Sequence, residues 1–172
     1  MVFETAFDFI IAKEGGYIED PYDKGGATKY GISARFIKTN DLKIKDVKDL
    51  TLLQAKEIYH MFFWNTLKID QFNDSTVQLF LFDTAVNCGN EKAAMLLQSS
   101  INSISHIAVD GKIGNETIGT CNNITSNTNN NKILKQLMLS SRIAYYMHIV
   151  GNDITQRRFL KGWVNRTTDI FK

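Results

Sequence analysis

VQLFLFDTAVN, residues 77–87, is almost wholly apolar and follows Ser75, a residue that can open a helix. A helix that is apolar on every side is typical of a protein interior, so this segment predicts a buried central helix. KILKQLMLSSRIAYYMHIV, residues 132–150, predicts a second long helix that Gly151 ends. The chain holds one proline against eleven glycines, which favours helices joined by Gly and Asn turns over a β-sandwich.

Shorter helices are expected on both sides of this centre. Phe3, Phe7 and Ile10 recur at helical spacing, so residues 2–14 predict an amphipathic helix ended by Gly15-Gly16. Residues 17–32, which hold the only proline, predict a loop with a short irregular hairpin. The other helices are expected from Ser33 to about Lys38, from the capping box Thr51–Gln54 to about Asn65, over residues 91–102, briefly after Asn115, and from a cap at Asp153 and Gln156 to a stop at Gly162. The expected fold is mainly α, with one small β-hairpin.

Composition excludes several classes of protein. The 172 residues are 44% hydrophobic and 22% charged, with a formal net charge of +2. These values indicate one globular domain, and no run approaches the roughly 18 apolar residues that a membrane span needs. Cys88 and Cys121 form no CxxC pair, and the three histidines lack metal-ligand spacing. We therefore expect two buried free thiols, no metal and no cofactor.

The charge is divided unequally along the chain. Residues 1–86 carry 10 basic and 13 acidic side chains, while residues 87–172 carry 10 basic and 5 acidic ones. A basic half can bind an acidic polymer, such as nucleic acid, lipid head groups or an anionic cell wall, or it can be plain solvated surface. Glu4 and Asp8 stand where a secretory signal would need positive charge and an unbroken apolar core. We therefore expect no signal peptide.

Residues suited to catalysis gather between positions 14 and 28. Glu14 is followed by Asp23 and then by Thr28, with glycine pairs between them. A helix end and a doubled-back hairpin can bring two carboxylates and a hydroxyl around one cleft. An inverting glycoside hydrolase needs an acid that protonates the leaving oxygen and a base that activates water. Spacing alone favours the simpler alternative, a surface charge at a helix end and an ordinary Asp-Gly turn.

The order of these residues resembles a known family. The segments Lys13-Glu-Gly-Gly-Tyr17, Asp23-Lys-Gly-Gly26, Thr28 and Tyr30-Gly-Ile-Ser33 are similar to the signature of glycoside hydrolase family 108. Members of that family are lysozyme-like N-acetylmuramidases of phage lysis cassettes and bacterial secretion systems. Further matches follow at Phe82–Asn87, Val109–Gly111 and Gly162–Arg166. Because an ordered signature over nearly the whole chain is far more specific than a lone triplet, the resemblance favours catalysis.

The resemblance implies a lysozyme-like fold and a role for each residue. Glu14 becomes the general acid, and Asp23 with Thr28 activates water. In the phage-type lysozymes the threonine follows the aspartate one residue later than it does here. Asp20, which precedes the proline, competes with Asp23 for the role of base. The candidate substrate-binding residues are Tyr17, Asp20, Tyr22 and Tyr30, although tyrosines in a hairpin can also pack against the core.

The implied activity is cleavage of the β-1,4 bond between N-acetylmuramic acid and N-acetylglucosamine in peptidoglycan. Residues 1–88 would form the muramidase core and residues 89–172 a helical peptidoglycan-binding region, packed into one compact unit. We expect a monomer that binds glycan strands, without nucleic acid and without stable membrane insertion. Two alternatives stay open: a lytic transglycosylase that uses Glu14 alone, and a non-catalytic peptidoglycan-binding module. The chain would be made in the cytoplasm and act in the periplasm or at the cell wall after release through a holin or a secretion system.

Overall fold

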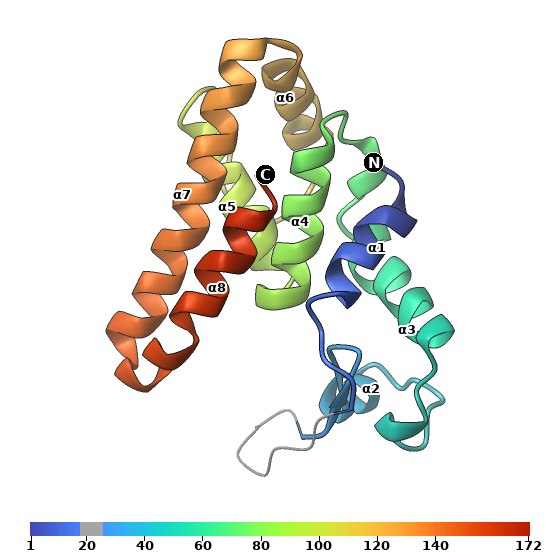
Figure 1. Ribbon diagram of the computed structural model, residues 1–172. Helices are drawn as coiled ribbons and strands as arrows, with labels where there is room; N and C mark the ends of the chain where they lie inside the picture. The colour runs from blue at the N-terminus through green and yellow to red at the C-terminus, as the bar shows by residue number, and fades with distance from the viewer. Residues whose placement is uncertain (18–25) are drawn as a thin grey trace. The chain divides into compact units, whose positions relative to one another are not determined.

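The computed structural model describes residues 1–17 and 26–172 (Figure 1). In these residues the chain is mainly α-helical and carries one two-stranded antiparallel sheet, which confirms the predicted fold class. The chain divides into two compact units, one over residues 2–62 and the other over residues 63–172. Apolar side chains are buried in both units.

The unit of residues 2–62 consists of short helices and a small hairpin. α1 (Phe3–Ile11) buries the apolar face that the sequence spacing predicts. α2 (Ala34–Thr39) begins at the predicted cap, where Ser33 Oγ accepts a hydrogen bond from the Phe36 N–H at 3.0 Å. α3 (Leu52–Tyr59) begins with the predicted capping box of Thr51 and Gln54. A 3₁₀ turn lies at Val47–Asp49, and a π-helical segment, His60–Asn65, follows α3.

The sheet of this unit is a tight hairpin. β1 (Thr28–Lys29) pairs with β2 (Ile32–Ser33), so that Thr28 lies opposite Ser33. Tyr30 and Gly31 form the two-residue turn, with φ angles of +53° and +74°. Positive φ at both positions defines a type I′ turn, whose twist matches that of the strands. Glycine adopts this conformation easily, but for Tyr30 it costs about 1 kcal/mol or more.

The unit of residues 63–172 is built from long helices. Figure 1 shows α7 along the length of this unit with α8 beside its C-terminal half, and α7 also contacts α5 and α6. α4 packs against α5 and is buried over residues 77–85, which confirms the predicted central helix. The elements are a 3₁₀ turn at Ile69–Gln71, α4 (Ser75–Cys88), α5 (Asn90–Asn102), α6 (Asn115–Ser126), α7 (Thr128–Asn152), a 3₁₀ turn at Ile154–Gln156 and α8 (Arg157–Asp169).

A charged cluster lies inside this second unit. Asp83 on α4 is fully buried, and its carboxylate lies 2.6 Å from Arg142 Nη2 and 2.8 Å from Arg166 Nε. The first contact is an ion pair whose alignment falls outside that of a hydrogen bond. Arg142 Nε donates to the Tyr146 hydroxyl at 2.9 Å, and that hydroxyl donates to Asn87 Oδ1 at 2.9 Å. Because charges in an interior are tolerated when they are paired, the cluster fixes α4 against α7 and α8.

Several predicted helix ends are wrong. α1 ends at Ile11 rather than at residue 14, and Gly151 and Gly162 lie within α7 and α8 instead of ending them. A glycine inside a helix costs about 1 kcal/mol relative to alanine, an amount that packing can offset. Beside Gly162, the ring of Trp163 stacks on Tyr146 with centroids 5.0 Å apart. The tertiary contact therefore outweighs the local preference of glycine.

The two cysteines are free thiols, as predicted. Cys121 is fully buried, whereas Cys88 at the end of α4 is only partly buried, which corrects one half of the expectation. Burial raises the pKa of the Cys121 thiol to about 12 and also raises the pKa of Cys88. Both groups are therefore protonated at neutral pH, and neither is an activated nucleophile.

The turn around Asp110 and Gly111 is structural. The buried Gln98 side chain donates to Asp110 Oδ1 at 2.9 Å and accepts from the Gly111 N–H at 2.8 Å. Gly111 has a φ angle of +74°, and the hydrogen bond from Gln98 lowers the pKa of Asp110. These bonds tie the turn to α5.

Candidate active site

Glu14 lies at the bend that follows α1. Its backbone N–H donates to the Ile10 carbonyl at 3.1 Å, so the residue continues the last helical turn although α1 ends at Ile11. The side chain is half-buried. The C-terminal end of a helix carries partial negative charge, so helix stability does not favour a carboxylate here. Such a local misfit is typical of residues kept for function.

The hairpin turn lies directly against the Glu14 carboxyl group. A methyl group on Gly31 would lie 2.8 Å from Glu14 Oε2, 2.9 Å from Glu14 Cδ and 2.5 Å from the Tyr59 hydroxyl oxygen. All three distances are too short for a carbon atom, so any larger residue at this position would displace these side chains. The Glu14 carboxyl group and the Tyr59 hydroxyl therefore converge on one side of Gly31.

Tyr59 holds this turn in place. Its side chain is buried at the end of α3, and its hydroxyl donates to the Tyr30 carbonyl at 2.9 Å. Its ring packs edge-on against Phe7 of α1, with centroids 5.7 Å apart. Sequence reasoning assigned Tyr59 no role in the site, because a tyrosine within a helical apolar run predicts only core packing. The two helices α1 and α3 thus position the turn and Glu14 together.

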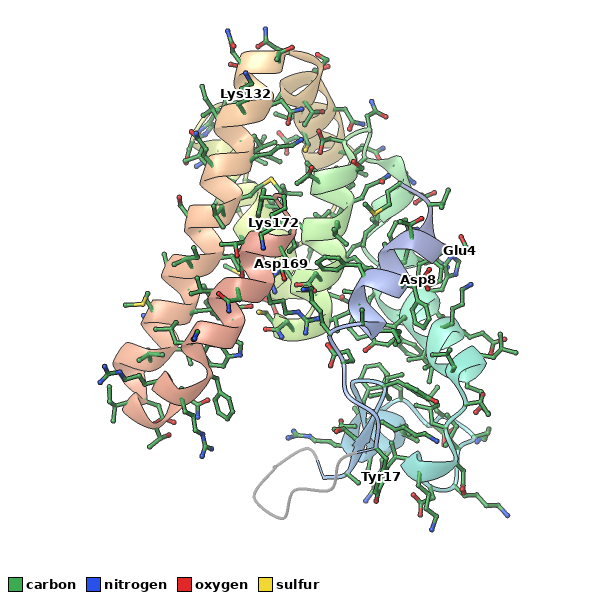
Figure 2. All side chains as sticks on the ribbon, in the orientation of Figure 1. Glu4, Asp8, Tyr17, Lys132, Asp169 and Lys172 are labelled. Carbon is green, nitrogen blue, oxygen red and sulfur yellow. The ribbon has the colours of Figure 1, made fainter. Side chains whose placement is uncertain are left out.

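Other predicted residues flank this convergence. Thr28 lies on the strand that enters the turn, and its half-buried side chain hydrogen-bonds to none of the described residues. Tyr30 occupies the turn, and the Lys29 ammonium lies over its ring, 5.5 Å from the centroid. Tyr17 is 44% exposed and lies at the end of the unit that holds α2 (Figure 2). The structure therefore brings Glu14 next to the backbone of the turn, with Thr28 on the strand that leads into the turn.

Three predicted site residues, Asp20, Tyr22 and Asp23, lie outside the described residues. Their roles as base and as substrate contacts stay predictions. Glu14, Tyr17, Thr28 and Tyr30 are the predicted site residues that the structure describes.

The described site offers one carboxyl group, one phenol hydroxyl and the backbone of a strained turn. These groups can bind and protonate a polyhydroxylated polymer. Within residues 1–17 and 26–172, no group of three or more His, Cys, Asp or Glu side chains is arranged to hold a metal ion. In the same part of the chain, no helix combines the length and the apolar character that crossing a membrane requires.

Both halves of the chain are similar to known proteins. Residues 7–89 match the family model described as glycosyl hydrolase 108, and residues 92–168 match the model described as "Predicted Peptidoglycan domain". The chain is also similar to the solved structure of Brucella abortus SagA, with 27% sequence identity and a TM-score of 0.79. That similarity covers 98% of this chain and 90% of SagA. A comparison with curated proteins found no match.

The match of residues 7–89 to a glycosyl hydrolase family identifies the chain as a glycoside hydrolase. Residues 7–89 belong to the glycosyl hydrolase 108 family, and residues 92–168 belong to the peptidoglycan domain family, which confirms the resemblance in the signature. Peptidoglycan is therefore the polymer on which the chain acts. The hydrolase region includes α4, which packs within the helical unit of residues 63–172.

Proposed function

We propose that the chain is an N-acetylmuramidase that hydrolyses the β-1,4 bond between N-acetylmuramic acid and N-acetylglucosamine. The observation that carries this proposal is the convergence of the Glu14 carboxyl group, Gly31 and the Tyr59 hydroxyl at a strained turn. Strained backbone is common at functional sites, and it persists only where the surrounding structure holds it in place. The convergence lies within the residues that match the glycosyl hydrolase 108 family.

Glu14 acts as the general acid in this proposal. The protonated carboxyl group gives its proton to the glycosidic oxygen while the bond between that oxygen and the anomeric carbon breaks. Asp23, with the Thr28 hydroxyl, removes a proton from water, which attacks the anomeric carbon from the opposite face. The position of Thr28 on the strand that leads into the turn supports its place near Glu14. Asp23 and its competitor Asp20 are proposed from the family signature.

Substrate contacts are proposed on both sides of Glu14. Tyr17 and Tyr30 would stack on sugar rings, and Asp20 and Tyr22 would add polar contacts. The exposure of Tyr17 supports this role, since an exposed ring can accept the face of a sugar. Residues 92–168 would bind the wall, as their family description suggests. We further propose that the chain acts as a monomer in the periplasm or at the cell wall after holin-dependent or secretion-dependent release.

The substitution Glu14→Gln tests the acid role. Glutamine keeps the size and the hydrogen bonding of the side chain but carries no acidic proton. We expect the rate of fragment release from purified peptidoglycan to fall by about 10²–10⁴-fold, with the melting temperature and the binding of sacculi unchanged. Glu4→Gln is the matched control, because Glu4 is an exposed carboxylate on α1 (Figure 2). Full activity of the Glu14→Gln variant would refute the proposal.

A further inference from the structure

A second feature of the unit of residues 2–62 is a cavity of about 580 Å³ beside the hairpin. Its apolar lining includes Ile37, Ile44 and Val47, and the exposed residues Lys38 and Lys45 also line it. We propose that this cavity binds the acidic peptide stem attached to the muramic acid residues of peptidoglycan, with Lys38 and Lys45 meeting the stem carboxylates. The inference rests on the proposed function and assigns the substrate specificity of the same site.

The hairpin connects the cavity to Glu14. Its turn contacts Glu14 through Gly31, while Ala27 and Ala34, at its open end, line the cavity. The Ala34 N–H donates to the Ala27 carbonyl at 2.9 Å and closes this end. Two residues of each strand separate the turn from the open end, so three steps of about 3.3 Å place the two sites about 10 Å apart. An extended peptide spans about 3.5 Å per residue, so the second and third residues of a stem reach the cavity from a sugar beside Glu14.

The charges of the rim favour an acidic ligand. Asp41 lies 3.1 Å from the Lys43 ammonium, and Asp46 lies 3.1 Å from the Lys48 ammonium. Hydrogen bonds from the Lys48 backbone and ammonium also lower the pKa of Asp46. Lys38 and Lys45 are exposed, and neither forms an ion pair with any residue that the structure describes. The carboxylates of the cavity thus have cations of their own, and two cations remain to meet a ligand.

The backbone fixes the shape of this cavity. α2 ends in a Schellman motif, in which the Asp41 N–H donates to the Lys38 carbonyl at 3.3 Å and the Leu42 N–H donates to the Ile37 carbonyl at 3.1 Å. Asp41 has a φ angle of +48°, a position where glycine is usual. The motif turns the chain so that residues 42–47 face α2 across the cavity. Lys29 of the hairpin donates to the Lys48 carbonyl at 2.6 Å and ties β1 to the far wall.

The ligand class follows from these features. A mixed wall of apolar side chains with two separated cations suits a short peptide that carries small side chains and free carboxylates. Peptide stems of peptidoglycan have this chemistry, whereas the glycan backbone is uncharged apart from its attachment groups. The cavity would therefore distinguish stem-bearing strands from bare glycan.

The double substitution Lys38→Gln with Lys45→Gln tests the inference. The matched control is Arg35→Gln, which removes one positive charge from the exposed side of α2 outside the cavity. Steady-state rates are measured on peptidoglycan fragments with intact stems and on the same fragments after enzymatic removal of the stems. Binding of a synthetic stem tripeptide, L-alanyl-γ-D-glutamyl-diaminopimelic acid, is measured in parallel by NMR titration.

We expect the double variant to raise the KM for stem-bearing substrate by about tenfold relative to the control, with kcat nearly unchanged. Its KM for stem-free glycan should rise much less, and its tripeptide binding should weaken. An equal change on both substrates, or unchanged tripeptide binding, would overturn the inference. If the wild-type chain cleaves neither substrate, the proposed function fails, and the titration with the tripeptide still decides the cavity. Lys45→Gln alone is the second variant, because it lies outside every helix and should not alter folding.

Discussion

The two compact units differ in how they place strain and charge. In residues 63–172, helices of up to 25 residues bury apolar side chains and pair the interior carboxylate of Asp83 with two arginines. In residues 2–62, the described helices have at most nine residues. Of the seven described residues with positive φ, four lie in this smaller unit: Gly26, Tyr30, Gly31 and Asp41.

This difference indicates that the helical unit stabilises the fold and that the smaller unit carries the proposed catalytic groups. The helical unit pairs its buried charges with one another, so changes there should act on stability. The smaller unit holds a half-buried acid against a strained turn, so changes there should act on activity with modest effects on folding. The following substitutions test this division, ordered from the largest to the smallest expected loss in the free energy of unfolding.

Asp83→Asn should produce the largest loss of stability. Without the carboxylate, the buried guanidinium of Arg142 and its neighbour Arg166 lose their counter-charge. Breaking a buried ion pair in this way costs about 3–5 kcal/mol, measured as the free energy of unfolding in urea. Asp70→Asn, which changes an exposed aspartate of the same unit, is the control. It should shift the free energy of unfolding by less than about 0.5 kcal/mol. A loss below about 1 kcal/mol for Asp83→Asn would show that the cluster is not what fixes α4.

Gly31→Ala should affect activity more than stability. The new methyl group would meet the Glu14 carboxyl group and the Tyr59 hydroxyl and displace both. Gly26→Ala is the matched control, since Gly26 has the same φ angle of +74° but its added methyl group would lie at an ordinary 3.8 Å from Ala34. Both variants should lose about 1–2 kcal/mol of stability from the positive φ.

The fall in kcat separates these two glycine variants. Gly31→Ala should lower kcat by about 100-fold, comparable with the loss of one positioned acid, and by at least tenfold more than Gly26→Ala does. Equal values of kcat for the two variants would mean that the close approach of Gly31 to Glu14 has no part in catalysis.

Asp74→Asn should have the smallest effect and a pH dependence. Asp74 caps α4 by accepting hydrogen bonds from the Thr76 and Val77 N–H groups, and it pairs with Lys135 at 2.9 Å. Burial alone would raise the pKa of Asp74, but hydrogen bonds from Asn131 and Lys135 offset it and the pKa is lowered. Asparagine keeps the cap and removes the ion pair, so we expect a loss of about 0.5–1 kcal/mol at neutral pH.

Acid titration of stability checks this assignment. Because the pKa of Asp74 is lower in the folded chain, its ion pair stabilises the fold above the unfolded value of about 4. That contribution is lost as the pH falls through the folded pKa. Urea unfolding of Asp74→Asn should therefore show a shallower decline below pH 4 than the wild type shows, and parallel curves would contradict the assignment.

Local rules in the sequence predicted much of the fold. The caps at Ser33 and Thr51 and the apolar run of residues 77–87 are determined by neighbouring residues, and each is confirmed. The predicted end of the last helix at Gly162 was wrong, because tertiary packing, which no local rule includes, accommodates this glycine within α8. The partners of Asp83 were not predicted at all. Arg166 lies 83 residues away in the chain, and no pattern within one helix indicates such a pair.

The candidate site shows the same limit. The misfit of a carboxylate at a helix end and the ordered family signature led to Glu14 from the sequence. The contact of Gly31 with Glu14 and the bond from Tyr59 to Tyr30 depend on how α1, α3 and the hairpin pack. Their residue types are ordinary in a turn and in a helix core, so only the structure shows that they meet at the site.

The most direct test of the central claim is mass spectrometry of the fragments that the wild-type chain and the Glu14→Gln variant release from purified peptidoglycan. Hydrolysis at the proposed bond predicts fragments with reducing N-acetylmuramic acid ends, each one water heavier than an anhydro end, from the wild type and almost none from the variant. Anhydro-muramic ends would show a lytic transglycosylase, and binding without fragments would show a non-catalytic module. Either result, or unchanged release by Glu14→Gln, would contradict the account.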